Sequence, residues 1–262
     1  MKRVDAAELA ISCGLGAWTA FGLLTMVMVG RNGKPQFSDG DLLTWSVGHR
    51  PDVAVAFARG LTATGTGVIP YALAALAGII AGRTLRQRAI ALALCLACLG
   101  AGQGLRYGVM ELVARPRPPQ ADWQTHASGW GFPSGHTTTA ALSAGLLIIA
   151  VCVRGPRGRT LLALVIGGWG ALVGLTRVYL GVHWFTDVLG GWLFALGWLG
   201  VCLGAVTSWL PERWTPNTTQ TDTARATKGP ARTTGGRTDT THQPREDHAA
   251  DDPGRRGRSR PA

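Results

Sequence analysis

The residues most suited to chemistry lie in one short stretch between two long apolar runs. Residues 176–187 read Thr-Arg-Val-Tyr-Leu-Gly-Val-His-Trp-Phe-Thr-Asp and set Arg177, His183 and Asp187 among apolar neighbours. Ionisable groups are costly to bury in hydrocarbon, so their presence at membrane depth indicates a functional site. His183 and Asp187 are four residues apart, which puts them on one face of a helix, where the carboxylate can orient the imidazole. The stretch thus offers an anion clamp, a nucleophile and the group that orients it.

Two further polar motifs precede this stretch. Residues 115–119 read Arg-Pro-Arg-Pro-Pro, and residues 133–136 read Pro-Ser-Gly-His. Arg117 of the first motif and Arg177 are fixed-charge forks that suit bidentate binding of a phosphate. Arginines held around a transferring phosphoryl group neutralise the charge on its oxygens, so phosphoryl transfer is the chemistry that this set favours.

The second motif supplies the start of a helix and a second histidine. Ser134 and the backbone N–H groups around Gly135 add neutral donors and the positive end of the helix dipole. His183 is the expected nucleophile and would form a phosphohistidine. His136 is then expected to protonate the leaving oxygen and to activate water for the second step. This scheme requires no metal and no other cofactor.

The composition is that of an integral membrane protein. Of the 262 residues 46% are hydrophobic and only 16% are charged, below the quarter typical of soluble domains. Several apolar runs reach the ~20 residues that a membrane-spanning helix needs. Many of the arginines behind the net charge of +11 flank these runs, where the positive-inside rule places them, so the charge does not indicate a nucleic-acid partner.

We expect an all-α bundle of six transmembrane helices. Short interfacial helices should follow the first span, at about residues 41–58, where Trp45 and charged residues interrupt the apolar pattern. A tail over residues 211–262 contains almost no large apolar side chains and should be disordered. The expected spans cover residues 9–30, 61–82, 89–113, 133–153, 160–180 and 184–210.

The basic loops predict how the bundle lies in the membrane. Basic residues lie before the first span and in the loops 83–88 and 154–159, which alternate to one side. By the positive-inside rule that side, with both termini, is cytoplasmic. All three polar motifs then meet at the outward face of a cell membrane, where a lipid headgroup lies.

The order and spacing of the motifs resemble the type-2 phosphatidic acid phosphatase superfamily, whose signatures read roughly K-x6-R-P, P-S-G-H and S-R-x5-H-x3-D. The resemblance covers about residues 37–205. It implies hydrolysis of a lipid phosphate or pyrophosphate, such as a polyprenyl pyrophosphate or a phosphatidate-type lipid, through a phosphohistidine. Carried over to this chain, it implies catalytic roles for His183, His136 and Asp187 and phosphate binding by Arg117, Ser134, Gly135 and Arg177.

The chain departs from the signatures at two positions. Thr176 stands in place of the serine, and Met110 in place of the lysine of the first signature. Methionine cannot bind a phosphate oxygen, whereas Arg106 lies one turn earlier on the same helix face and can reach toward that place. We therefore expect Arg106 to substitute in part for the missing lysine.

Two other functions use the same residues. Met110 leaves open a lipid-binding protein with a decayed site, and vanadium haloperoxidases, which are soluble, share the signatures. His49 and His126 match no motif and are expected to be surface residues. Cys95 and Cys98 form a C-x-x-C without the second pair or the histidines that a zinc site needs, so no metal site is expected.

Overall fold

The computed structural model describes residues 3–209, and every regular element in this part of the chain is a helix. The predicted all-α class is confirmed, whereas the predicted tail, residues 211–262, lies outside the described residues. The helices are α1 (Arg3–Gly30), α2 (Asp39–Gly48), α3 (Asp52–Ala63), α4 (Val68–Ala81), α5 (Leu85–Val113), α6 (Gly135–Arg154), α7 (Arg159–Tyr179) and α8 (Phe185–Trp209), with a 3-10 turn at Gln120–Asp122.

Five of these helices are long and apolar enough to cross a membrane, namely α1, α5, α6, α7 and α8. A sixth candidate span is formed by α3 and α4 together, which are bent by 52° at the break between them. The expected spans at residues 9–30, 89–113, 133–153, 160–180 and 184–210 overlap the five single helices.

The expectation of one continuous helix over residues 61–82 is wrong. α3 ends at Ala63 and α4 begins at Val68, and the four residues between them read Thr-Gly-Thr-Gly. The Thr64 hydroxyl turns back to donate to the Leu61 carbonyl at 2.7 Å, which competes with helix hydrogen bonding. Gly67 has φ +66°, which a helix does not allow. The run is apolar enough to be read as one span, but its backbone is not that of one helix.

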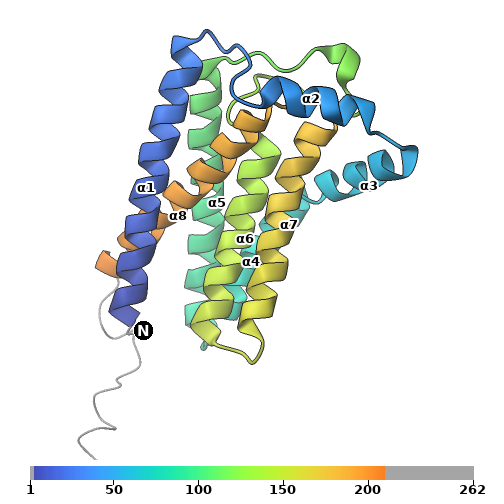
Figure 1. Ribbon diagram of the computed structural model, residues 1–262. Helices are drawn as coiled ribbons and strands as arrows, with labels where there is room; N and C mark the ends of the chain where they lie inside the picture. Colours follow the sequence, from blue (N-terminus) through green and yellow to red (C-terminus); the bar gives the residue numbers. More distant parts are fainter. Residues whose placement is uncertain (1–2, 210–262) are drawn as a thin grey trace, which may run out of the picture. The chain divides into compact units, whose positions relative to one another are not determined.

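Two short helices follow α1, as predicted. α2 lies across the ends of the upright helices, and α3 leads down from it toward α4 (Figure 1). α3 packs through Val55 and Ala58 against Leu180 and Val182, which lie in the turn between α7 and α8. This apolar contact supports the turn that carries His183.

The most buried of the spanning helices is α6, which packs against α4, α5, α7 and α8. Gly170 of α7 faces Ala140 and Ala144 of α6, and such small residues allow two helices to approach closely. On the other side of the bundle α1 packs against α8, where the rings of Phe21 and Phe194 meet edge to face at 5.5 Å. The first and last spanning helices are therefore neighbours.

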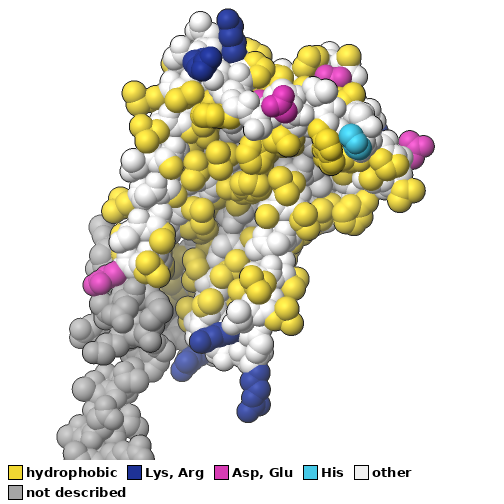
Figure 2. Space-filling model, viewed as in Figure 1, with side chains coloured by type: hydrophobic (Ala, Val, Ile, Leu, Met, Phe, Trp, Pro, Cys, Tyr) yellow, Lys and Arg dark blue, Asp and Glu magenta, His cyan; other side chains and the backbone are white. Residues whose placement is uncertain are grey.

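The outer surface of the helices is apolar. Hydrophobic side chains cover their flanks, and lysine and arginine side chains stand at the two ends (Figure 2). Exposed apolar side chains in such number would aggregate in water, whereas a bilayer accommodates them. The exposed apolar residues include Leu23, Leu161 and Leu196.

Gly67→Ala should destabilise the protein by about 1–3 kcal/mol, because the space around Gly67 is open and only its backbone conformation excludes a side chain. Gly60→Ala, in the exposed interior of α3 with equally open space, is the matched control and should stabilise by about 0.5–1 kcal/mol. Thermal unfolding of the detergent-purified variants measures both. Equal midpoints for the two variants would contradict the assignment of the break to Gly67.

Candidate active site

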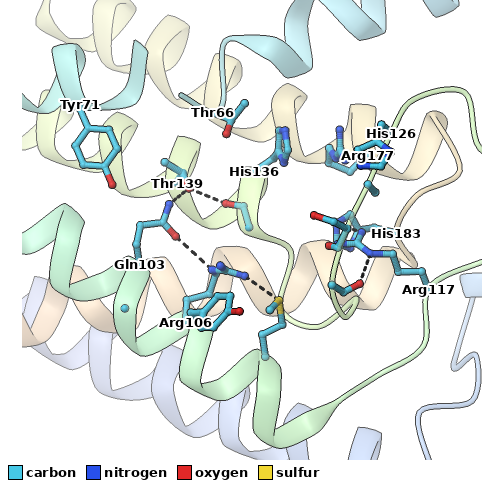
Figure 3. Close-up of a pocket in the computed structure, with 17 residues that line it drawn as sticks. Thr66, Tyr71, Gln103, Arg106, Arg117, His126, His136, Thr139, Arg177 and His183 are labelled. Atoms are coloured by element: carbon cyan, nitrogen blue, oxygen red, sulfur yellow. Dashed lines mark hydrogen bonds between the residues drawn. The ribbon is translucent and has the colours of Figure 1, made fainter. Parts of the chain in front are cut away.

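The three polar motifs meet at one end of the helix bundle, around a cavity of about 690 Å³. The side chains come from four different parts of the chain and point toward one another (Figure 3). Asp187, in the first turn of α8, is fully buried beside His183. The predicted residues that line the cavity are Arg117 after α5, Gly135 and His136 in the first turn of α6, Arg177 in the last turn of α7, and His183 between α7 and α8.

His183 and Asp187 form the expected pair, although they do not share a helix. α7 ends at Tyr179, the chain turns at Gly181 with φ +72°, and His183 precedes the first residue of α8. His183 Nδ1 lies 3.2 Å from Asp187 Oδ2, and the backbone N–H of Trp184 donates to the same oxygen at 3.0 Å. The turn thus brings together a pair that the sequence places on one continuous helix.

The neighbours of the His183 ring fix its tautomer. Asp187 Oδ2 is an acceptor, so Nδ1 carries the hydrogen and donates it. Nε2 then has the free lone pair and accepts from Arg117 Nη1 at 2.7 Å. This arrangement leaves Nε2, the nitrogen that can attack phosphorus, beside a fixed positive charge.

Hydrogen bonds to neighbouring protein groups fix the two predicted phosphate-binding arginines in the cavity wall. Arg117 Nε donates to Gly129 O at 2.9 Å, and its Nη2 donates to Ser128 O at 2.8 Å. Arg177 is 2% exposed, and its Nη1 donates to the Thr62 hydroxyl at 3.0 Å. The buried Nε of Arg177 has no hydrogen-bond partner in the described part of the chain, so this donor is available to an anion.

The start of α6 places its three predicted residues differently. His136 is half-buried and lines the cavity together with Gly135. Ser134 is fully buried and is not among the lining residues; its hydroxyl accepts from the Thr137 hydroxyl at 2.9 Å. The Ser134 backbone N–H donates to Asp187 O at 3.0 Å, so this residue joins the start of α6 to the start of α8.

Arg106, which was predicted to substitute in part for the missing lysine, belongs to the cavity wall. It lines the cavity, and a methyl group placed on Gly135 would lie 3.4 Å from Arg106 Nη1, so the guanidinium faces the start of α6. Gln103 Oε1 accepts from Arg106 Nε at 3.2 Å, and Met110 Sδ lies 3.4 Å from Nη1 (Figure 3). Gln103 is held in turn by a hydrogen bond to the Thr139 hydroxyl. Met110 therefore packs against the arginine expected to act in its place.

The cavity lining is strongly basic, and no Asp or Glu within residues 3–209 lines it. Within the same residues no three His, Cys, Asp or Glu side chains are grouped to hold a metal ion. His126, predicted to be a surface residue, is exposed but also lines the cavity, whereas His49 is exposed and does not. The basic lining residues are Arg106, Arg117, Arg177, His126, His136 and His183.

Two buried charges were not anticipated. Arg115 opens the polar motif at residues 115–119, yet it is fully buried, and Asp39 of α2 is 1% exposed. Arg115 forms ion pairs with Asp39 at 2.8 Å and with Asp187 at 2.5 Å. The Arg-Pro-Arg-Pro motif marks Arg115 as unusual, but no local spacing connects it with a residue 76 positions earlier.

Burial and charge act together on the groups outside the spanning helices. Burial, followed by the positive charges of Arg117 and Arg177, lowers the pKa of His183 well below its usual 6.5. Burial also lowers the pKa of Arg117 from its usual value. The lowered pKa of His183 favours a neutral imidazole at neutral pH, which a nucleophilic nitrogen requires.

The sequence is similar to known phosphatases over its C-terminal membrane helices. Residues 88–215 match the family model of the PAP2 superfamily. Phosphatidylglycerophosphatase B of Bacillus subtilis is 37% identical over 109 residues, which are 40% of this chain and 52% of that protein. Phosphatidylglycerophosphatase B of Escherichia coli K12 is 37% identical over 98 residues, 37% of this chain and 35% of that protein. The aligned part therefore spans about half or less of these relatives.

The fold is also that of a solved structure. The crystal structure of a transmembrane PAP2-type phosphatidylglycerolphosphate phosphatase from Bacillus subtilis superimposes with a TM-score of 0.61 at 24% identity, over 75% of this chain and 97% of that one. This likeness concerns the fold and extends beyond the segment matched by the family model. The motifs and the sequence match both point to the PAP2 superfamily, whose family model residues 88–215 match, and the fold is the one seen in a PAP2-type phosphatase.

Proposed function

We propose that the protein is a membrane phosphatase that hydrolyses a lipid phosphate or pyrophosphate through a phosphohistidine on His183. The observation that carries this proposal is the placement of His183 Nε2. Its lone pair is set by the Asp187 contact on the other ring nitrogen, and Arg117 Nη1 lies 2.7 Å away at the cavity wall. A phosphate bound to Arg117 has its phosphorus beside the nitrogen that attacks it.

In the first step His183 Nε2 forms a bond to phosphorus while the bond from phosphorus to the leaving oxygen breaks. Arg117 and Arg177 neutralise the charge on the remaining phosphoryl oxygens, as positioned cations do in phosphoryl transfer. His136 gives a proton to the leaving oxygen, and Asp187 accepts the Nδ1 hydrogen bond as the ring becomes positive. The backbone N–H groups at Gly135 add donors at the helix start.

In the second step water replaces the histidine on phosphorus. His136, now neutral, accepts a proton from the water as its oxygen bonds to phosphorus, and the nitrogen–phosphorus bond breaks. Inorganic phosphate leaves and His183 returns to its starting tautomer. The scheme needs only residues of this chain.

The substrate is expected to carry its phosphate on a membrane lipid. The cavity opens among helices with apolar flanks, and its lining is basic without a carboxylate from the described residues. The two relatives are named as phosphatidylglycerophosphatases, which favours a glycerophospholipid phosphate. A polyprenyl pyrophosphate or a phosphatidate-type lipid fits the same chemistry.

We place the site at the outward face of a cell membrane, with the N- and C-termini on the cytoplasmic side. The loops 83–88 and 154–159 are both basic, and they lie at the opposite end of the bundle from the turn between α7 and α8 (Figure 1), which favours this orientation.

Met110 favours one alternative, a lipid-binding protein whose catalytic site has decayed. The contacts between His183, Asp187 and Arg117 favour the enzyme instead, because binding a lipid phosphate needs the arginine but not an oriented imidazole. The assay below separates the two functions, and bromide oxidation in the presence of vanadate would identify a haloperoxidase.

The purified protein should release phosphate in the presence of a chelator from at least one of phosphatidylglycerophosphate, phosphatidate and a polyprenyl pyrophosphate. His183→Ala removes the nucleophile and should lower kcat by ~10⁴-fold or more. His49→Ala, an exposed histidine outside the cavity, is the control and should behave as the wild type. Phosphate release that survives in His183→Ala would rule out the phosphohistidine. A wild type that hydrolyses none of these lipids would instead favour the lipid-binding protein.

Arg106→Ala should lower kcat/KM by about 10–100-fold, the effect of losing a charged hydrogen bond to the phosphate. Arg106→Lys keeps the charge and should retain most of the activity. Arg83→Ala, in a basic loop at the far end of the bundle, is the control. Steady-state kinetics on the best lipid of the panel measure the effect. An unchanged rate in Arg106→Ala would mean that Arg106 does not substitute for the missing lysine.

The pH dependence should reflect the lowered pKa of His183. Because the neutral imidazole is the attacking form and its pKa lies well below 6.5, kcat/KM should stay level as the pH falls through 6.5, and the acid limb should appear only below it. Two lipid phosphates with different second pKa values separate the titration of the enzyme from that of the substrate. A limb at or above pH 6.5 with both substrates would show that His183 is not shifted in this direction.

A further inference from the structure

Asp39 is the first residue of α2. In the sequence it lies far from the polar motifs and outside the segment matched by the family model. It is nevertheless buried and accepts four hydrogen bonds. Thr186, at the start of α8, donates its backbone N–H to Oδ1 at 2.9 Å and its hydroxyl to Oδ2 at 2.7 Å. Arg115 Nη2 and the backbone N–H of Gln36 also donate to Oδ2, at 2.8 and 2.9 Å. The carboxylate therefore holds both the start of α8 and the Arg115 guanidinium.

Arg115 lies between two carboxylates. Its Nη1 donates to Asp187 Oδ1 at 2.5 Å and to the Thr186 hydroxyl at 2.6 Å, while Nη2 faces Asp39. Its Nε donates to Gly33 O at 3.2 Å. A buried row of alternating charge thus runs from Asp39 through Arg115 to Asp187, and ends on the His183 ring.

The division of the Arg115 fork has a consequence for His183. A guanidinium with one carboxylate partner favours two parallel hydrogen bonds, one to each oxygen. If Arg115 bound Asp187 in this way, it would take Oδ2, the oxygen that accepts from His183 Nδ1. Asp39 occupies the second arm of the fork, so that Asp187 meets Arg115 with Oδ1 alone and keeps Oδ2 for the imidazole.

We propose that Asp39 is a positioning residue for the His183–Asp187 pair and acts through Arg115. The inference rests on the proposed function, in which His183 is the nucleophile. It assigns to the start of α2 a part in catalysis, although no residue of α2 lines the cavity. Asp39 fixes the orientation of the carboxylate and hence the direction of His183 Nε2, without touching the substrate.

Asp39→Asn in the full-length chain tests this role. Steady-state kinetics in detergent should show kcat lowered by about 10–100-fold, the usual effect of losing a partner that orients a functional group. KM should change by less than about threefold, because Arg117 and Arg177 keep their own anchors. Asp41→Asn, an exposed carboxylate on the same helix, is the matched control and should retain wild-type kinetics.

A second background distinguishes positioning from mere stabilisation. In Asp187→Asn the carboxylate that Asp39 protects is already gone, so adding Asp39→Asn should cause little further loss of the residual kcat. Equal fold-losses in both backgrounds, a loss confined to KM, or an unchanged kcat in folded Asp39→Asn would each overturn the inference. Should Asp39→Asn not fold, Asp39→Glu, which keeps the charge but shifts it, should fold with kcat several-fold lower, and wild-type kcat in that variant would overturn the proposal.

The two proposals fail in different ways. If the wild type turns over, His183→Ala is inactive and Asp39→Asn is normal, the role of Asp39 alone is wrong. If His183→Ala retains the wild-type rate, the proposed mechanism is wrong, whatever Asp39→Asn does.

Discussion

The site depends on how the two oxygens of the Asp187 carboxylate are divided. One oxygen meets Arg115, and the other meets the His183 ring and the Trp184 backbone. A carboxylate without access to water is tolerated only when its lone pairs and its charge are matched. Here the partners that make the buried group tolerable are also the ones that decide where the imidazole points. Stability and reactivity therefore rest on the same few contacts.

Charge is separated across the His183 ring. Behind it, Asp39, Arg115 and Asp187 alternate in sign and are fully enclosed. In front of it, the cavity carries arginines whose charge no lining carboxylate within the described residues offsets. A cavity of one sign with walls of low polarity concentrates ions of the other sign. The acids needed to set up the histidine are thereby kept from competing with an anion for the arginines.

Most of the basic side chains of the cavity could be predicted from the sequence, because they lie in short motifs in which spacing carries information. Arg117, His136, Arg177 and His183 all line the cavity as expected. Even so, the His183–Asp187 pair is built by a turn and not by one helix, since Gly181 ends the regular backbone after α7. A spacing of four allows both geometries, so it predicted the contact without fixing the backbone.

The remaining features have no local signature. Asp39 and Arg115 are joined only by the fold, and an aspartate at the start of a short interfacial helix is an ordinary capping residue by sequence. The sequence Thr-Gly-Thr-Gly marks the break between α3 and α4. The hydropathy is nevertheless high enough on both sides of it to predict a single span. Ser134 is the converse case. The Pro-Ser-Gly-His motif predicted that the residue belongs to the site, but its burial against Thr137 follows from the fold and has no signal in the motif.

The packing of α1 against α8 has a consequence for how the protein is made. The chain emerges from the ribosome from its N-terminus, so Asp39 and Arg115 are synthesised well before the two residues that they hold, Thr186 and Asp187. Until α8 enters the membrane, α1 lacks the helix that covers it, and Arg115 lacks one of its two carboxylates. Insertion of α8 therefore places α1 against its partner and forms the His183–Asp187 pair in one event, and a chain arrested before it carries the arginines but no oriented imidazole.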